Sequence, residues 1–395
     1  MRILFVSSLA YPDVKGGVDA VIFELLNRLK ADHEVLHLRP RPWRDPAPED
    51  VTIEGLRCLV MPLTVPYTSK GSLRDLLKGV LAFPVDMARL VKLLRASKVD
   101  VIHLHTLQYY QIYFAVLRWF GGPPYVITLH GSETGAYPER SWLGRWVWRQ
   151  VLKGAEHVVA VSPSLLRRAA DALPFCKKIQ VIENATRIDP AELLNRTDLE
   201  TALGRELPQR YVTILGALRP VKGQDRAIAA WPAVRARMPD LHLLIVGDGA
   251  SREPYEAAIQ DLGCGDVVHL IARQPRQIAL SIAKSSLGLL MPSRSEGLPI
   301  ALLEAAALEL PLVCSAIPAF VDIVGESGNA VVVDPDDAEK LAEAIVGIAG
   351  DEALRRALGQ SLAGTIRERF SADVMVRAYC EVYRASLKNG PREAH

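Results

Sequence analysis

The chain has 395 residues, of which 49% are hydrophobic, and carries 47 lysines and arginines against 45 aspartates and glutamates. This length predicts two domains, and the balanced charge excludes the basic footprint of a nucleic-acid-binding protein. The five cysteines are dispersed without metal-type spacing, which indicates a reducing compartment, and no run of 18 apolar residues is present to span a bilayer. We therefore expect a cytoplasmic protein.

In the first half of the chain, short apolar runs alternate with longer helical stretches. This alternation predicts a parallel sheet with crossover helices. The predicted strands are Arg2–Ser7, Glu34–Leu38, Arg57–Met61, Val99–Leu104, Tyr125–Thr128, His157–Val161 and Gln180–Ile182. The predicted helices are Val18–Ala31, Ser72–Ala96, Gln108–Phe120, Trp142–Gly154 and Ser164–Ala172.

A second series of the same kind follows Pro190–Pro208, a polar stretch that we interpret as a linker. Residues 1–195 are therefore expected to form one doubly wound domain and 205–371 another, with ligands at the carboxyl ends of the strands and a cleft between the domains. The last helical stretch, 372–388, could pack back on the first domain. The second series comprises predicted strands at Tyr211–Gly216, Leu241–Gly247, Val267–Ile271, Leu287–Met291, Leu312–Cys314 and Ala330–Val333, and predicted helices at Gln224–Met238, Glu253–Leu262, Pro275–Lys284, Pro299–Leu308, Ala338–Gly347 and Glu352–Ser361.

Three short motifs follow predicted strands. Gly16-Gly17 precedes a helix, where paired glycines allow a diphosphate to approach the backbone, although a simple turn is an equal alternative. His130-Gly131 follows the strand Tyr125–Thr128, which favours a site role for His130, whereas His103 and His105 alternate within a strand and are interpreted as structural. The segment 216–223 places Arg219 and Lys222 in a Gly-rich loop suited to a diphosphate, or in a solvated surface pair.

The segment Met291–Ala307 carries two carboxylates eight positions apart, Glu296 and Glu304, around a predicted helix start at Pro299. Spacing alone also fits two ordinary surface glutamates. Glu304, however, is surrounded by alanines and leucines, and a carboxylate there needs a partner or a ligand. The free N–H groups at the helix start would add donors beside these acceptors, a combination that suits a sugar nucleotide.

Two further features have a structural and a functional interpretation. Asp334-Pro335-Asp336 matches an Asp-X-Asp metal string, but its position before a helix favours a turn and cap. The helix Trp142–Gly154, with Trp142, Arg145, Trp146, Trp148 and Arg149, could touch an anionic membrane or be docked by its aromatic side chains. A second basic set has the same two interpretations: Arg74, Lys78, Arg89, Lys92, Arg95 and Lys98.

With these motifs the chain resembles the retaining GT-B glycosyltransferases of family 4. The segment from Glu296 to Glu304 resembles the family's E-x7-E motif, and the other pieces follow in the family's order over nearly the whole chain. They are Gly16-Gly17, His130-Gly131, Val159–Ser162, Ile182–Asn184, Lys222-Gly223 and Val246–Gly249.

The resemblance implies a GT-B fold, with two Rossmann-like domains facing each other across a cleft. It implies transfer of a sugar from a nucleotide diphosphate sugar, a UDP- or GDP-sugar, with retention of anomeric configuration and without a metal or other cofactor. The acceptor would be a glycan, a lipid-linked sugar or a small metabolite. Peripheral contact with the inner face of a membrane is compatible with this activity, and nucleic acid is not an expected partner.

The resemblance also implies roles for individual residues. Glu304 would hold the ribose hydroxyls, and Lys222 would neutralise the departing diphosphate. His130 would lie beside the donor sugar and stabilise the charge that develops near its anomeric centre. The donor sugar's hydroxyls would be held by Glu296 and by the backbone of Gly297, Leu298 and Pro299, and the diphosphate would accept the N–H of Gly17, next to Gly16.

The chain departs from the family where Ala217 occupies the customary arginine position, and Arg219 is expected to supply that charge. A usual glycine is also replaced in Glu309-Leu310-Pro311, without a functional consequence that the sequence shows. Two rivals remain: another GT-B enzyme, such as a sugar-nucleotide epimerase or a phosphorylase, and a non-catalytic nucleotide-sugar-binding subunit. No pyridoxal-phosphate lysine site is identifiable for a phosphorylase, and only Ala217 favours a non-catalytic member.

Overall fold

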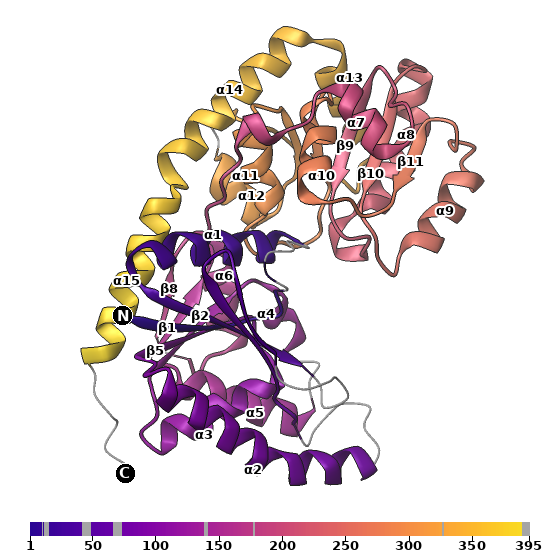
Figure 1. Cartoon of the computed structure of the whole chain (residues 1–395). Coiled ribbons are helices and arrows are strands. Elements are labelled where there is room, and N and C mark those ends of the chain that lie inside the picture. Colours follow the sequence, from indigo (N-terminus) through magenta and orange to yellow (C-terminus); the bar gives the residue numbers. More distant parts are fainter. Residues whose placement is uncertain are drawn as a thin grey trace. The chain divides into compact units, whose positions relative to one another are not determined.

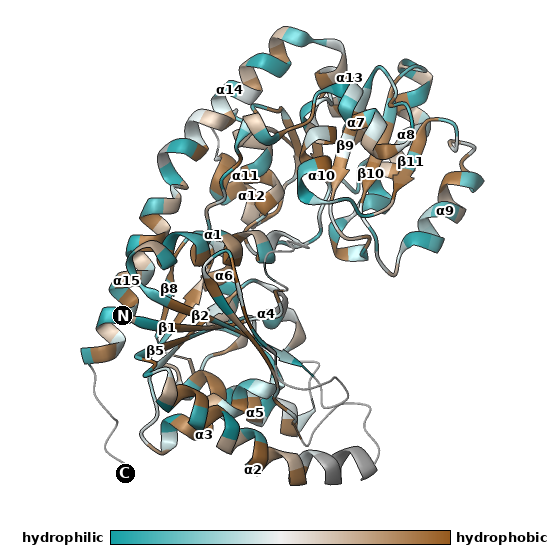
Figure 2. Ribbon diagram, viewed as in Figure 1, coloured by the Kyte–Doolittle hydropathy of each residue, from teal (hydrophilic) through white to brown (hydrophobic). Residues whose placement is uncertain are grey.

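The computed structural model describes residues 1–395 except for Ala10, 12–15, 42–48, 66–72, 138–140, 177, 326–327 and 389–395. The chain divides into two compact units (Figure 1). The first comprises Met1–Val14, Val18–Asn184 and Ala372–His395, and the second comprises Lys15–Gly17 and Ala185–Ser371. Each unit contains its own largely parallel sheet with covering helices, which confirms the expected two-domain α/β fold class. Most strands are largely apolar, whereas the helices show polar outer faces (Figure 2).

The sheet of the first unit has the strand order β3-β4-β2-β1-β5-β6-β7-β8. All neighbours pair in parallel except β3 (Glu49–Ile53), which runs antiparallel to β4 and which the sequence analysis missed. It begins with two adjacent charged residues, Glu49 and Asp50, and lacks the apolar run that marks the other strands. Those strands are β1 (Arg2–Val6), β2 (Glu34–Arg41), β4 (Leu56–Pro62), β5 (Val101–His105), β6 (Tyr125–Leu129), β7 (His157–Ala160) and β8 (Ile179–Val181).

The helices of the first unit pack on this sheet. Helices α2, α3 and α5 lie together on one side (Figure 1), where Phe83 of α2 stacks on Tyr113 of α3 with ring centroids 4.3 Å apart. The last helix of the chain, α15, packs on β5 and β6. The helices are α1 (Gly17–Asp32), α2 (Leu73–Ala96), α3 (Ile112–Trp119), α4 (Ser132–Ala136), α5 (Trp142–Gly154), α6 (Pro163–Ala172) and α15 (Ala372–Lys388), with a short 3-10 turn at Tyr109–Gln111.

The sheet of the second unit is fully parallel, in the order β11-β10-β9-β12-β13-β14. Its strands are β9 (Tyr211–Leu215), β10 (His242–Val246), β11 (Val268–Ile271), β12 (Leu289–Met291), β13 (Leu312–Ser315) and β14 (Val331–Val333). Its helices are α7 (Arg196–Leu203), α8 (Gln224–Arg237), α9 (Arg252–Asp261), α10 (Arg276–Lys284), α11 (Ile300–Ala307), α12 (Pro318–Val324), α13 (Ala338–Gly350) and α14 (Glu352–Arg369), with 3-10 turns at Pro190–Glu192 and Pro220–Lys222.

The stretch Pro190–Pro208 is not the plain linker that its polarity predicted. It contains α7, which is capped by the Asn195 side chain and closed by Gly204 in the left-handed conformation. Leu199 of this helix is fully buried in a small core with Tyr211. One buried leucine in a polar stretch gives no periodic signal. The sequence therefore does not predict this helix, which is recognised only from its packing in the structure.

Both sheets have a point where the strand order changes direction: between β1 and β5 in the first unit, and between β9 and β12 in the second. In open α/β sheets, loops that leave neighbouring strands on either side of this point separate and create a ligand-binding crevice. One site below lies at the switch point of the second sheet, and the other lies at the ends of β5 and β6, beside the switch point of the first. Within the described residues, no helix is both long enough and apolar enough to cross a membrane.

Candidate active site

The loops that follow β9 and β12 meet at the switch point of the second sheet. Gly223, at the end of the β9 loop, has a φ of +70°, and a Cβ atom there would lie 1.9 Å from the carbonyl oxygen of Pro292 in the β12 loop. Only glycine fits this approach. The N–H of Arg294 also donates to the carbonyl of Val221 at 2.8 Å. Backbone contacts alone therefore hold the two loops together.

Lys222 and Glu296, from these two loops, form an ion pair. The Lys222 Nζ donates to Oε1 and Oε2 of Glu296 at 2.8 and 3.0 Å. Ser293 Oγ donates to the same carboxylate at 2.8 Å. The Glu296 side chain is 8% exposed and the Lys222 side chain 32%. The pair thus joins a largely buried acceptor to a cation that remains accessible to an anion.

Glu304 does not join this ion pair but is held by another cation, Arg276. Arg276 donates to Glu304 Oε1 through Nε at 3.1 Å and through its terminal nitrogen at 2.8 Å, and it also donates to the Thr186 hydroxyl. Burial raises the pKa of the Glu304 carboxyl, and Arg276 partly offsets that rise. The partner that its apolar surroundings required is therefore present.

The helix that carries Glu304 begins one residue later than predicted. Pro299 occupies the N-cap position with φ −76° and ψ 100°, and α11 starts at Ile300. Leu298 and Pro299 are buried beside it, as is Gly297. These three residues therefore connect Glu296 to the helix as a packed segment.

The customary cation position, Ala217, is an exposed residue in the β9 loop. Its carbonyl accepts a hydrogen bond at 3.0 Å from the side chain of Gln224, which is fully buried. Arg219 is exposed, and its side chain has no polar partner among the residues that the structure describes. A free guanidinium two positions from Ala217 is suited to meet an anionic ligand.

Replacing Arg219 by alanine is expected to raise the KM for the donor several-fold, because an exposed guanidinium–phosphate contact contributes about 1 kcal/mol. Steady-state kinetics with varied donor measure this. The matched control is Arg210→Ala, since Arg210 pairs with Asp240 at the opposite end of β9. Identical kinetics in the Arg219 variant and the wild type would show that Arg219 does not replace the arginine that is absent at position 217.

His130 lies just past the carboxyl end of β6, as predicted, and is half-buried. Its backbone N–H donates to both carboxylate oxygens of Glu133 at 3.2 Å, and Gly131 N–H donates to Oε2 at 2.7 Å. Glu133 is 2% exposed. Burial raises the pKa of the Glu133 carboxyl, and these backbone donors partly offset the rise. Gly131, with a φ of +117°, makes the turn that this arrangement needs.

Two buried histidines of β5 lie behind His130. His105 Nδ1 is 3.2 Å from His130 Nε2. His103 lies 2.8 Å from the Tyr383 hydroxyl through Nδ1 and 2.8 Å from the Thr128 hydroxyl through Nε2. His103 is therefore structural, as expected, since both of its nitrogens are used within the core. His105, also expected to be structural, is buried as well and is the direct neighbour of a candidate site residue.

The buried histidines predict acid sensitivity of the first unit. Burial lowers the pKa of His130 to about 4, of His103 to about 3 and of His37 to about 4. Unfolded histidines bind protons below about pH 6.5 while these folded ones do not, so stability is full above that pH and falls towards pH 4. His37 alone should cost about 2 kcal/mol at pH 5.

Hydrogen exchange at pH 7.5 and pH 5, corrected for intrinsic rates, would measure this. Protection of β5 and β6 should fall at pH 5 by more than that of β9, because the second unit has only the half-buried pair His242 and His269, whose ring nitrogens lie 3.1 Å apart. An equal loss of protection in both units would contradict the assignment of acid sensitivity to the buried histidines of the first unit.

Two predicted motifs remain, the glycine pair Gly16-Gly17 and the string Asp334-Pro335-Asp336. Gly17 is the first residue of α1, and Gly16 and Gly17 are exposed, while Asp13, Val14 and Lys15 of the same motif lie outside the described residues. Asp334 forms a turn by accepting the N–H of Asp336, which pairs with Arg226. Among all the residues that the structure describes, no cluster of histidine, cysteine and acidic residues is arranged to hold a metal.

Sequence reasoning missed the residues that hold the two glutamates. Ser293 and Arg276 carry no motif, and Thr186 lies 90 positions from the arginine that contacts it. A signal was available for Arg276, since it is a cation at the start of a helix just after a predicted strand. His105 had a comparable signal at the last position of its strand.

The two halves of the chain match two family models. Residues 16–185 match the glycosyl transferase 4-like domain, and residues 195–362 match glycosyl transferases group 1. The phosphatidyl-myo-inositol mannosyltransferase of Mycolicibacterium smegmatis is 28% identical over 361 residues, which cover 90% of this chain and 86% of that protein.

Two solved structures share the fold over nearly the whole chain. Sucrose-phosphate synthase from Thermosynechococcus elongatus superposes with a TM-score of 0.78 at 19% identity, covering 98% of this chain and 100% of that one. The Anabaena HepE protein in complex with UDP and glucose gives a TM-score of 0.76 at 18% identity, with the same coverage. At these identities the structures establish the fold alone.

Proposed function

Because the chain is a GT-B glycosyltransferase of the family 4 type, we propose that it transfers a sugar from a UDP- or GDP-sugar to a hydroxyl group, with retention of anomeric configuration and without a metal. The acceptor class is a glycan, a lipid-linked sugar or a small metabolite. In this reaction the bond between the sugar and the diphosphate is exchanged for a bond to the acceptor oxygen. The nucleoside diphosphate departs, and the acceptor's proton is released.

The observation that carries this proposal is the contact between Lys222 and Glu296 at the switch point of the second sheet. A transferase that uses a sugar diphosphate needs a cation for the leaving group next to an acceptor for the sugar's hydroxyls. Lys222 and Glu296 supply these two groups side by side, on loops fixed by their backbones. A fixed cation at the leaving group supplies the charge stabilisation that a metal ion provides in other transferases.

The other residues take the roles implied by their positions. Glu304 would bind the ribose hydroxyls, and the packed segment Gly297, Leu298 and Pro299 would line the donor sugar. Arg219 would add charge at the diphosphate, and Gly17 would donate its N–H to it. His130 would contact the donor sugar, and binding of both substrates would complete the site.

The comparisons favour a transferase over the two rivals. The curated relative that covers 90% of this chain is named as a mannosyltransferase, not as an epimerase. A non-catalytic subunit would have no need for the Lys222–Glu296 pair, which is intact. HepE is described with UDP and glucose, which supports a nucleotide-linked donor for this chain.

The deciding experiment is a thermal-shift screen over UDP-, GDP- and ADP-sugars, followed by transfer assays with the stabilising donor in the presence of EDTA. A donor that binds the folded state raises the melting temperature. We expect one nucleotide class to stabilise the protein, transfer to persist in EDTA, and NMR of the product to show the donor's anomeric configuration. Inverted product would overturn retention, and loss of transfer in EDTA would overturn metal independence.

We also propose that the first unit contacts an anionic membrane surface, through the outer face of α5. Trp142 and Trp146 of this helix are 74% and 47% exposed, and α5 contains no acidic residue. Three exposed basic side chains share this face: Arg145, Arg149 and Lys153. Trp148, in contrast, is docked in the core. Aromatic and basic residues on one helix face are typical of interfacial binding.

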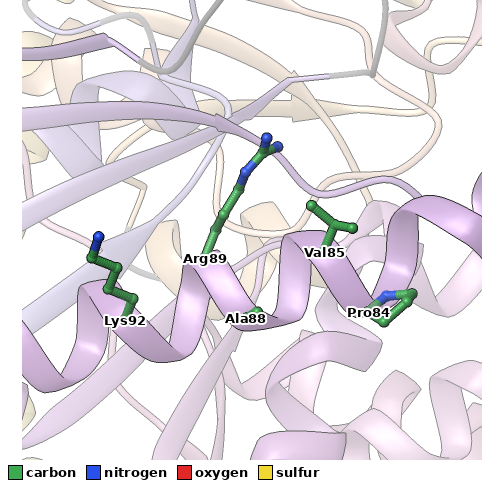
Figure 3. A pocket seen from close by; sticks show the side chains of 5 residues that line it. All are labelled: Pro84, Val85, Ala88, Arg89 and Lys92. Atoms are coloured by element: carbon green, nitrogen blue, oxygen red, sulfur yellow. The ribbon is translucent and has the colours of Figure 1, made fainter.

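Helix α2 supports the same proposal. Pro84, Val85, Ala88, Arg89 and Lys92 line an open hollow of about 450 Å³ (Figure 3), in which apolar side chains lie next to two cations. Leu81, one turn away, is 73% exposed. Asp86 of this helix is fully buried and pairs with Arg89, so it adds no exposed negative charge beside the hollow.

Vesicle flotation tests the membrane proposal. The protein should float with vesicles of phosphatidylcholine and phosphatidylglycerol but not with phosphatidylcholine alone, because the cations need anionic lipid. Trp142→Ala combined with Trp146→Ala should weaken flotation about tenfold. The control is Trp119→Ala, on α3, which also removes an exposed tryptophan (52% exposed) but lies on a different helix. Flotation of the double variant at the wild-type level would contradict the role of α5.

A further inference from the structure

His105 has a single hydrogen-bond partner in the described part of the chain, and that partner is His130. Its side chain is 1% exposed at the end of β5. The ring stacks on Phe5, with centroids 5.4 Å apart, and lies 4.1 Å from the ring of His103. It therefore cannot turn to another partner, and its Nδ1 stays 3.2 Å from His130 Nε2.

The other ring nitrogen of His105 determines where the proton lies. His105 Nε2 is buried without a partner. A buried N–H that lacks an acceptor is rarer in proteins than an under-satisfied acceptor. The proton of the neutral ring is therefore on Nδ1, which donates to His130 Nε2. Because that nitrogen of His130 then accepts, the proton of neutral His130 must be on its Nδ1.

We propose that His105 is a positioning residue that holds His130 in the Nδ1-protonated tautomer, so that His130 presents a neutral N–H donor to an oxygen atom of the bound substrate. Nδ1 of His130 has no hydrogen-bond partner among the described residues, and the ring is half-buried. The role towards substrate rests on the proposed function, whereas the tautomer is a property of the free protein.

The neighbouring groups support this arrangement. The Glu133 carboxylate accepts the backbone N–H groups of His130 and Gly131, so it does not compete for the ring. His103 is engaged by Tyr383 and Thr128. Burial, followed by the nearby histidines 103, 130 and 37, keeps the pKa of His105 well below its ordinary value. Both rings of the His105–His130 pair are therefore neutral at pH 7.

The backbone also fixes His105. The next residue, Thr106, is β-branched yet has a φ of +57°. Its carbonyl accepts a hydrogen bond at 2.7 Å from the amide of Gln111, which is fully buried. Backbone in a sparsely populated conformation persists only where its surroundings determine it, and it concentrates at functional sites. The end of β5 is thus held in the conformation that aims His105 at His130.

Imidazole NMR of the free full-length protein tests the tautomer directly. Protonated and unprotonated ring nitrogens have widely separated 15N shifts, and His130→Gln identifies the signals of His130 among those of the nine histidines. We expect Nδ1 of His130 to be protonated and Nε2 to be unprotonated at pH 7. A protonated Nε2 on neutral His130 would overturn the proposal.

Three variants separate positioning from packing. His105→Phe keeps a stacking ring but removes the donor, and should shift His130 towards the Nε2-protonated tautomer and lower kcat by about 10- to 100-fold. His105→Asn places an amide N–H where Nδ1 was, and should recover most of that loss. His103→Phe alters the same buried strand without touching His130, and should leave its tautomer unchanged.

The outcomes also distinguish the proposals from each other. If His105→Phe and His105→Asn lower kcat equally while the His130 spectrum stays as in the wild type, His105 has only a packing role and the positioning proposal fails. If the wild type shows the expected tautomer but transfers no sugar from any donor, the proposed function fails and the assignment of the tautomer stands.

Discussion

Replacing Glu296 by alanine is expected to reduce kcat by about 10²- to 10³-fold, because it removes the acceptor of the donor sugar's hydroxyls and the anchor of Lys222 together. Lys222 Nζ contacts both oxygens of this carboxylate, and Ser293 donates to one of them. The loss should be seen in steady-state kinetics at saturating donor. Folding should be retained, because the freed Lys222 side chain is already one-third exposed and can be solvated.

Two variants calibrate this prediction. Glu296→Gln keeps a hydrogen-bond acceptor but loses the charge, so it should lie between alanine and wild type if the hydroxyl contact matters as well as the ion pair. Asp266→Ala removes a surface carboxylate of the second unit that pairs with Arg235, and should leave turnover unchanged. Wild-type turnover in Glu296→Ala would show that the site is assigned to the wrong residues.

Replacing Glu304 by alanine is expected to raise the KM for the donor by about 10- to 100-fold, because a hydrogen bond to a charged acceptor contributes roughly 1.5–3 kcal/mol. A competing explanation is that Glu304 serves only to hold Arg276, which contacts it at 2.8 Å. A donor without the ribose 2′-hydroxyl separates the two. Wild type should bind this analogue more weakly than the normal donor, and Glu304→Ala should not distinguish them.

Thermal unfolding provides the control for Glu304→Ala. Arg276 would keep its hydrogen bond to Thr186 and is 30% exposed, so the variant should remain folded with a modest loss of stability. If the variant discriminates against the analogue as strongly as wild type does, Glu304 does not bind the ribose, and its contact with Arg276 is sufficient reason for its presence.

The central parallel strands could be predicted because they are buried on both faces. Such strands are continuous apolar runs, as in β10 and β12, whose residues from Leu243 to Val246 and from Leu289 to Met291 are all buried. Strand β3 and helix α7 could not be predicted, because their residues are mostly polar. Helix α12 was missed for the opposite reason: its run of apolar residues has no periodicity to separate a helix from a strand.

Part of the site could be predicted, because functional residues of parallel α/β sheets lie in the loops that follow the strands. Lys222, Glu296 and His130 each lie in a loop after a predicted strand, and the structure places the first two in contact. Their partners could not be deduced in the same way. Arg276 reaches Glu304 from a different helix, and Ser293 and His105 are recognised only by distance. A sequence shows which side chains are reactive, but contacts between distant segments require the fold.

The packing of α15 against the first sheet has a consequence for the order in which the protein folds as it is synthesised. Tyr379 and Tyr383 of this helix lie within hydrogen-bond distance of Thr128 and His103, in the core of the first unit. Residues 185–371 leave the ribosome before α15 does. The sequence from 185 to 371 can therefore fold before the core of the first unit is completed, because that core needs the side chains of α15.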